Sequence, residues 1–142
     1  MNRSAIFRVL DANLNRLREG IRVVEEFYRF VLNDALEAKK LKALRHEIRQ
    51  IEMGLSREEL LAGRESDHDI FRSGSEARER ERSGFNQLVI ANIRRAQEAA
   101  RVLEEYLKLI EESPLSEIAK EIRFSLYSVE KRWEIEHGNK KD

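Results

Sequence analysis

Residues 12–27 read ANLNRLREGIRVVEEF, and residues 91–106 read ANIRRAQEAARVLEEY. The second stretch repeats the first at a constant offset of 79 residues (91 minus 12, and 106 minus 27). Two copies of a helix can form with only their apolar positions in common, so the shared Asn, Arg and Glu residues require a further explanation. We expect the rest of the chain to bring these two stretches together.

The apolar residues around both stretches follow the period of a helix, with spacings of four and three held over three heptads. They are Leu10, Leu14, Leu17, Ile21, Val24, Tyr28 and Val31 in the first half, and Val89, Ile93, Ala96, Ala100, Leu103, Leu107 and Ile110 in the second. This pattern predicts one helix over about residues 7–32 and another from near residue 84 to the break at Ser113-Pro114.

Three further helices and a connecting segment complete the prediction. We expect helices over about residues 36–53, 57–62 and 115–136. Residues 64–75 have no helical period and are predicted to form a loop. The charge run at 76–82 is typical of a solvated helix or a hinge.

The repeat extends into the second helix of each half, where its offset becomes 78. Leu44-Arg45-His46 aligns with Ile122-Arg123-Phe124, so one residue was lost or gained between the helices. The repeated unit is thus a helical hairpin, over about 7–53 and again over about 86–136, with a connecting loop at 63–84. Two hairpins bury their apolar faces by packing together, which predicts one all-α domain: an antiparallel helical bundle with pseudo-twofold symmetry.

Composition narrows the class of protein. The 27 basic and 27 acidic residues cancel, which argues against nucleic-acid binding and against an anionic membrane surface. No cysteine is present, so a thiol nucleophile and a cysteine metal site are excluded. The N-terminus has no signal-peptide core and no run approaches the ~18 apolar residues of a membrane span. We therefore expect a soluble, cytoplasmic protein.

Polar residues of both copies lie beside the apolar seam on a helical wheel. They are Asn13 and Arg16, next to Gly20, and Asn92 and Arg95, next to Ala99. The small residues leave room between the helices for a pocket, with Glu19 and Glu98 in its lining. Forked arginine donors suit a phosphate ligand there. The structural alternative is a polar network that fixes the hairpin register, because a buried arginine needs a partner.

Other charged residues carry weaker signals. Arg22, Glu25 and their equivalents Arg101 and Glu104 are interpreted as ordinary helix pairs of the scaffold. In the loop, Arg64, Asp67 and Asp69 have a spacing that could surround a phosphate-bound magnesium ion, although an Asp-rich turn more often caps itself. His46, on the inner flank of its helix, is more typical of a satisfied histidine than of a catalyst.

Read in order, the doubled stretch, Leu44-Arg45-His46 and residues 64–69 resemble one family over roughly residues 5–130. It is the small helical domain often fused ahead of thiamine-phosphate synthase in bacteria. That domain is described as an alternative hydroxymethylpyrimidine-phosphate kinase, unrelated to the ribokinase-like enzyme.

The resemblance implies phosphoryl transfer from ATP, with Mg²⁺, to 4-amino-5-hydroxymethyl-2-methylpyrimidine phosphate in thiamine biosynthesis. Its implied phosphate ligands are Arg16 and Arg95, with Asn13 and Asn92 orienting substrate, and Asp69 near magnesium or the attacking phosphate. Arg64, Arg45 and His46 are secondary candidates. After Asp69 the chain departs from the family, because Ile70-Phe71-Arg72 replaces a smaller turn.

Two alternatives stay open. One is a non-catalytic ligand-binding or regulatory module that associates with a separate thiamine-phosphate synthase. The other is a helical interaction protein whose repeated charges only hold the bundle together. The sequence also leaves a homodimer open.

Overall fold

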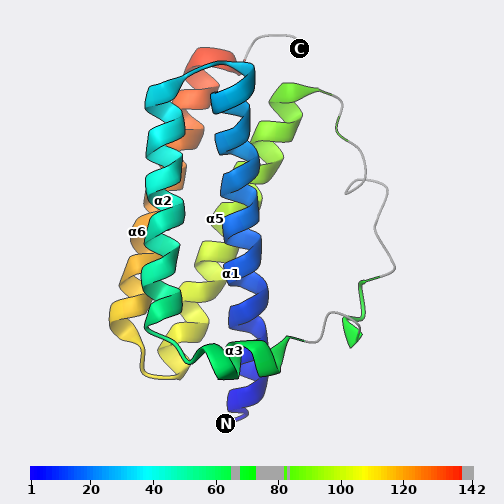
Figure 1. Ribbon diagram of the computed structural model, residues 1–142, viewed down its shortest axis with the longest axis vertical. Coiled ribbons are helices and arrows are strands. Elements are labelled where there is room, and N and C mark those ends of the chain that lie inside the picture. Colours follow the sequence, from blue (N-terminus) through cyan, green and yellow to red (C-terminus); the bar gives the residue numbers. More distant parts are fainter. Residues whose placement is uncertain (65–67, 73–81, 83, 139–142) are drawn as a thin grey trace.

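The computed structural model describes residues 1–64, 68–72, 82 and 84–138, and these residues form helices and turns without a strand. The elements are α1 (Arg3–Glu26), the π-helical turn η1 (Phe27–Val31), α2 (Ala35–Met53), α3 (Arg57–Gly63), α5 (Phe85–Leu109) and α6 (Ser113–His137). Figure 1 shows the four long helices side by side, with α3 lying across one end. The predicted all-α class is confirmed.

The first helix begins earlier than predicted. Asn2 caps it, because the side-chain oxygen of Asn2 accepts a hydrogen bond from the amide of Ala5 at 3.0 Å. The other predicted helices lie within a few residues of their expected bounds. Ser56 caps α3, because its hydroxyl oxygen accepts a hydrogen bond from the amide of Glu59 at 3.2 Å.

The change of offset from 79 to 78 falls in η1. Each hairpin turns at a non-glycine residue with positive φ, Asn33 at 54° and Glu111 at 60°, and these two residues are 78 apart. Glu26 and Glu105, which end the doubled stretch just before its aromatic residue, are still 79 apart. The first hairpin therefore holds one extra residue between these points, and the helix absorbs it by widening into a π-helical turn.

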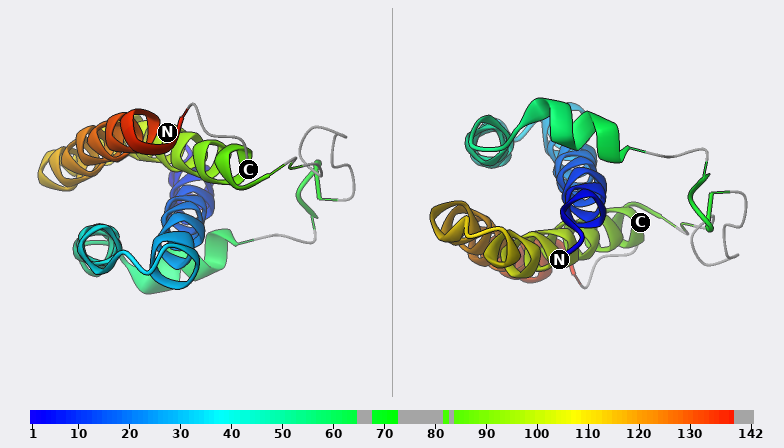
Figure 2. Two further views of the ribbon diagram at one scale, coloured as in Figure 1. Left: turned by 90° about the horizontal axis from the view of Figure 1, so that it is seen from above. Right: turned by 90° about the horizontal axis from the view of Figure 1, so that it is seen from below.

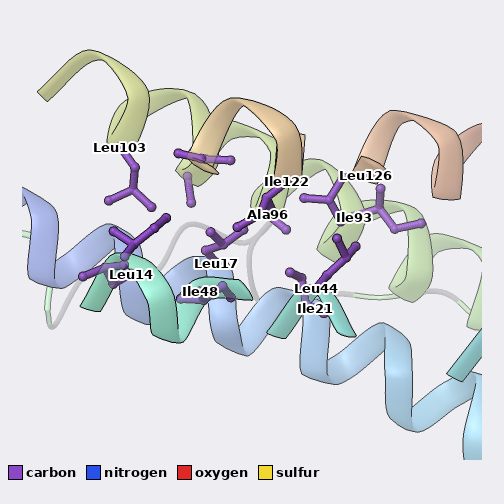
Figure 3. Close-up of a cluster of buried hydrophobic side chains, with 14 of the residues drawn as sticks. Leu14, Leu17, Ile21, Leu44, Ile48, Ile93, Ala96, Leu103, Ile122 and Leu126 are labelled. Atoms are coloured by element: carbon purple, nitrogen blue, oxygen red, sulfur yellow. The ribbon is translucent and has the colours of Figure 1, made fainter. Parts of the chain in front are cut away.

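The core lies between the two hairpins. Figure 2 shows the α1–α2 pair on one side and the α5–α6 pair on the other, and α1 and α5 make the most extensive contact. The seam residues of both repeats are buried in one continuous cluster, part of which Figure 3 shows. Each large aliphatic side chain buried there contributes about 1.5–3 kcal/mol. Neither hairpin encloses this core alone.

Helix α3 is held against the first turns of α1. A Cβ atom on Gly63 would lie 2.9 Å from the backbone nitrogen of Arg8, so only a glycine allows this approach. Arg3 also forms a salt bridge with Glu59 at 2.7 Å. No helix among the described residues is both long and apolar enough to span a bilayer.

Candidate functional site

Helices α1 and α5 approach each other closely at Gly20. A Cβ atom on Gly20 would lie 3.0 Å from the carbonyl oxygen of Asn92 and 3.3 Å from the Cβ atom of Ala96. Both distances are tighter than ordinary van der Waals contact. The pocket predicted between the helices at Gly20 is therefore wrong: the missing side chain there allows the helices to touch.

The two repeated asparagines make the same local hydrogen bond. The side-chain amide of Asn13 donates to the carbonyl oxygen of Val9 at 2.9 Å, and that of Asn92 donates to the carbonyl oxygen of Leu88 at 2.8 Å. Each side-chain amide donates one N–H to this bond, and its second N–H and its oxygen can still bond a ligand. Asn13 is buried and Asn92 is half-buried. The first role of both residues is thus to brace their own helices beside the crossing.

Arg16 and Arg95 are both exposed, which corrects the expectation that they lie in a partly apolar sector. Within the part of the chain that the structure describes, neither forms a hydrogen bond or an ion pair. α1 and α5 run in opposite directions (Figure 1), and residue 20 packs against residues 92 and 96. This register sets residue 16 near residue 96, so the two arginines flank the crossing, one from each helix.

Exposed glutamates accompany the two arginines. Glu19 and Glu98 lie three residues further along the same helices, and both are exposed. At about 100° per residue, each glutamate is one helical turn from its arginine. The outer face of the α1–α5 crossing therefore carries two arginines and two carboxylates, in matching positions of the two repeats. We call Arg16, Glu19, Arg95 and Glu98 the crossing face.

Another repeated arginine pair behaves differently. Arg22 forms an i,i+4 salt bridge with Glu26, and Arg101 forms one with Glu105, each at 3.0 Å. These arginines are exposed like Arg16 and Arg95 and stand on the same two helices. Among the described residues, the structure thus pairs Arg22 and Arg101 within their helices and leaves Arg16 and Arg95 without an ion pair. Free guanidinium groups retain all their donors for an anionic ligand.

Arg45 on α2 forms an ion pair with Glu25 on α1, which corrects the expectation that Glu25 pairs within its own helix. Its Nη2 atom lies 2.9 Å from Oε2 of Glu25, and its Nε atom bonds the other carboxylate oxygen. The hydrogen bond to Glu25 raises the pKa of Arg45, so this guanidinium stays charged. Arg123 and Glu104 form the same pair in the second hairpin, with 3.0 Å between Nη2 and Oε1. Arg123 was not among the candidate residues, although its offset of 78 from Arg45 identifies it.

Arg64 is fixed by a residue that the sequence reasoning missed. Its Nε and Nη2 atoms lie 2.8 and 2.7 Å from the two carboxylate oxygens of Asp11, which is buried. The hydrogen bond to Asp11 raises the pKa of Arg64. Asp11 and Arg16 are five residues apart, which is about 140° around the helix. Arg64 therefore stands on another flank of α1 than the crossing face.

The remaining candidates do not join the crossing face. The carboxylate of Asp69 accepts a hydrogen bond from the amide of Phe71 at 2.9 Å, as a turn-capping aspartate does. His46 is exposed on α2, which corrects its expected place on an inner flank. Asp67 lies outside the described residues.

A cavity of about 370 Å³ lies elsewhere, between α2 and α6. Its lining comprises Glu47, Gln50, Glu117, Ile118 and Glu121. Burial, together with the charge of Glu121, raises the pKa of Glu47. Three carboxylates repel a phosphate, so this cavity does not compete with the crossing face for a phosphorylated ligand.

Comparison with known proteins identifies the family. The model of the ThiD2 family matches residues 8–132. The chain belongs to the ThiD2 family. This match extends from the first turns of α1 into the last turns of α6, so it includes both copies of the repeat and the whole crossing face.

Curated relatives of this ThiD2 chain are named thiamine-phosphate synthase. The protein of Thermosynechococcus vestitus is 44% identical over 123 residues, which are 87% of this chain and 34% of that protein. The proteins of Synechocystis sp. and Rhodopirellula baltica are 39% and 33% identical, over 89% and 92% of this chain and 36% and 34% of their own lengths. The chain thus spans about a third of the relatives it matches. No solved structure matches it.

Proposed function

We propose that this ThiD2-family chain phosphorylates 4-amino-5-hydroxymethyl-2-methylpyrimidine phosphate with ATP, giving the diphosphate for thiamine biosynthesis in the cytoplasm. The observation that carries the proposal is the pair of exposed arginines on the crossing face, which have no partner among the residues that the structure describes. Support for the pathway comes from relatives that are named thiamine-phosphate synthase. A pyrimidine phosphate is a ligand that such arginines can bind through its phosphate.

The two hairpins form one shared site in this proposal. Matching residues of the two repeats occupy matching places: Gly20 and Ala99 are both buried, and Arg16 and Arg95 are both exposed. We infer a pseudo-twofold axis through the α1–α5 crossing, between the two arginines. A single chain of phosphate groups lying over the crossing can then accept hydrogen bonds from both hairpins.

The reaction needs charge neutralisation and alignment more than covalent help. An oxygen of the substrate phosphate attacks the γ-phosphorus of ATP, the bond from that phosphorus to the β,γ-bridging oxygen breaks, and ADP leaves. Arg16 and Arg95 neutralise the charge that spreads over the transferred group. The second N–H of Asn13 or Asn92 orients a phosphate oxygen.

In this proposal, magnesium enters the site bound to the phosphates of ATP. Among residues 1–64, 68–72, 82 and 84–138, no three His, Asp or Glu side chains gather as a metal site would require. Mg²⁺ commonly takes one or two protein carboxylates and completes its shell with phosphates and water. Glu19 or Glu98 on the crossing face can supply one such carboxylate. When bound, the ion supplies charge neutralisation between the phosphates.

The test is turnover by arginine variants with a matched control. Purified chain, ATP, Mg²⁺ and the pyrimidine monophosphate should give ADP and the diphosphate. Arg16→Ala and Arg95→Ala should each lower kcat/KM roughly 10- to 100-fold, since a charged hydrogen bond is worth about 1.5–3 kcal/mol. Arg22→Ala and Arg101→Ala should change it less than about threefold, because exposed i,i+4 pairs contribute little. Equal effects in the two sets would refute the assignment of the site.

One observation favours a second function. The relatives are named thiamine-phosphate synthase, and the segment that matches this chain is only 34% of their length, which suggests that the segment works together with a synthase. Here the chain is a non-catalytic module that binds the pyrimidine phosphate or regulates a thiamine-phosphate synthase. It predicts pyrimidine phosphate binding, measured by calorimetry, without formation of ADP or diphosphate. Binding lost in Arg16→Ala and retained in Arg22→Ala would then leave the crossing face as the ligand site and remove the kinase reaction.

A further inference from the structure

Four exposed apolar side chains stand where η1 leads into α2. Phe30, Val31 and Leu32 are consecutive, and Leu36 follows at the start of α2. Their exposed fractions are 63%, 47%, 36% and 65%. Runs of three or more exposed apolar residues are disfavoured on a free surface unless they serve a contact. We call these four residues the corner surface.

The π-helical turn builds the corner surface in one hairpin only. The extra residue of the first hairpin lies in η1, next to this run. The offset of 78 pairs the four residues of the corner surface with Lys108, Leu109, Ile110 and Pro114, among which only Leu109, at 47%, is a large hydrophobic side chain exposed to solvent. A π-helical insertion costs stability and is found frequently at functional positions. The two turns, otherwise matched, thus differ in apolar character.

The corner surface lies at the end of the bundle where α6 terminates and α5 begins (Figure 1). The ring of Phe27 packs 5.0 Å from that of Phe85 and 5.5 Å from that of Trp133, which fixes the three helix ends together. Phe85 is itself 50% exposed. In a longer relative, any chain that follows the matched segment starts at this end.

We propose that the corner surface is the docking site for the synthase region of a thiamine-phosphate synthase. In the curated relatives, about two-thirds of the chain lies outside the match and is tethered to the helical segment. Tethering holds that region at high effective concentration, so a modest apolar contact is enough to orient it. The corner surface offers such a contact, and its occupant presents an apolar face of its own. The proposal rests on the association with synthase and is independent of phosphoryl transfer.

Two variants at equivalent positions test the proposal. Val31 and Leu109 are 78 residues apart and each is 47% exposed. Val31 ends η1 and Leu109 ends α5, and these two elements end at opposite ends of the bundle (Figure 1). The probe is the thiamine-phosphate synthase encoded by the same genome, and its affinity for the full chain is measured by biolayer interferometry. Val31→Asp and Phe30→Asp should weaken the complex about tenfold or more, as central apolar contacts do. Leu109→Asp should leave the affinity within about twofold.

Three results would overturn the proposal. The first is no complex with the wild-type chain at about 100 μM, a concentration at which even weak contacts register. Equal weakening by Val31→Asp and Leu109→Asp is the second. The third is a wild-type dimer, detected by light scattering, that Val31→Asp dissociates while the synthase fails to bind, since a second copy then occupies the surface. Circular dichroism checks that each variant is folded, and turnover by Val31→Asp at the wild-type rate separates docking from the proposed kinase site.

Discussion

Removing the guanidinium of Arg45 tests the buried ion pairs that join the helices of each hairpin. The side chains of Arg45 and Glu25 are 17% and 6% exposed. Arg45→Met leaves the carboxylate of Glu25 buried without its partner, which typically costs 3–5 kcal/mol. We expect the lower end, about 3 kcal/mol, because part of Arg45 reaches solvent. For a chain of this size, that loss lowers Tm by about 10 °C.

The measurement is urea unfolding followed by circular dichroism, with thermal melts as a second readout. Arg22→Met is the control: its salt bridge with Glu26 is exposed, so the expected loss is about 0.5 kcal/mol or less. The double variant Glu25→Met/Arg45→Met should recover to within about 1 kcal/mol of the wild type, because apolar replacements of a buried pair are often neutral. A loss below about 1 kcal/mol for Arg45→Met, or no recovery in the double variant, would refute the reasoning.

Two further variants each probe one side chain, Tyr28 and Glu47. The Tyr28 hydroxyl is buried and is the one such side-chain atom without a hydrogen-bond partner among the described residues, so Tyr28→Phe should stabilise the protein by about 1 kcal/mol in urea unfolding. Burial and the charge of Glu37 raise the pKa of Tyr28. Its late ionisation should therefore vanish from the 295 nm titration of Tyr28→Phe. The pKa of Glu47 is raised in the folded protein, so the protonated carboxyl group favours folding. This contribution to stability is lost as the pH rises through the raised pKa and the group ionises. Glu47→Gln should consequently gain a few tenths of a kcal/mol at pH 7 and nothing near pH 3; a loss of stability in either variant would contradict these assignments.

The sequence predicts the helices well because their signals are local. Seam positions such as Leu17 and Ile93 recur at helical spacing, and these residues are buried as expected. Capping residues such as Ser56 also act over only a few positions. The offset change between the repeats shows that a residue was gained or lost, but a π-helical turn and a longer loop would give the same offset. Only the structure distinguishes them.

The candidate site is harder to read, because helical position does not reveal what a neighbouring helix covers. Gly20 on α1 and Ala99 on α5 leave little side-chain volume where the two helices face each other, and this pattern fits either an open pocket or a close crossing. The contact of Gly20 with Asn92 shows the crossing. Arg16 lies at the margin of that flank, where a small rotation separates buried from exposed. Asp11 carried no repeat signal at all, since Ile90 occupies the equivalent position.

The division of the core between two hairpins bears on how such a chain arose. A lone hairpin leaves its seam open to water, so it is soluble only when a second hairpin covers it. An ancestral single hairpin would therefore have worked as a pair of identical subunits, at a concentration-dependent cost. Joining the two copies made their association intramolecular. Within one chain the two copies can also differ, because a residue gained or lost in one copy does not change the other, and η1 marks such a difference.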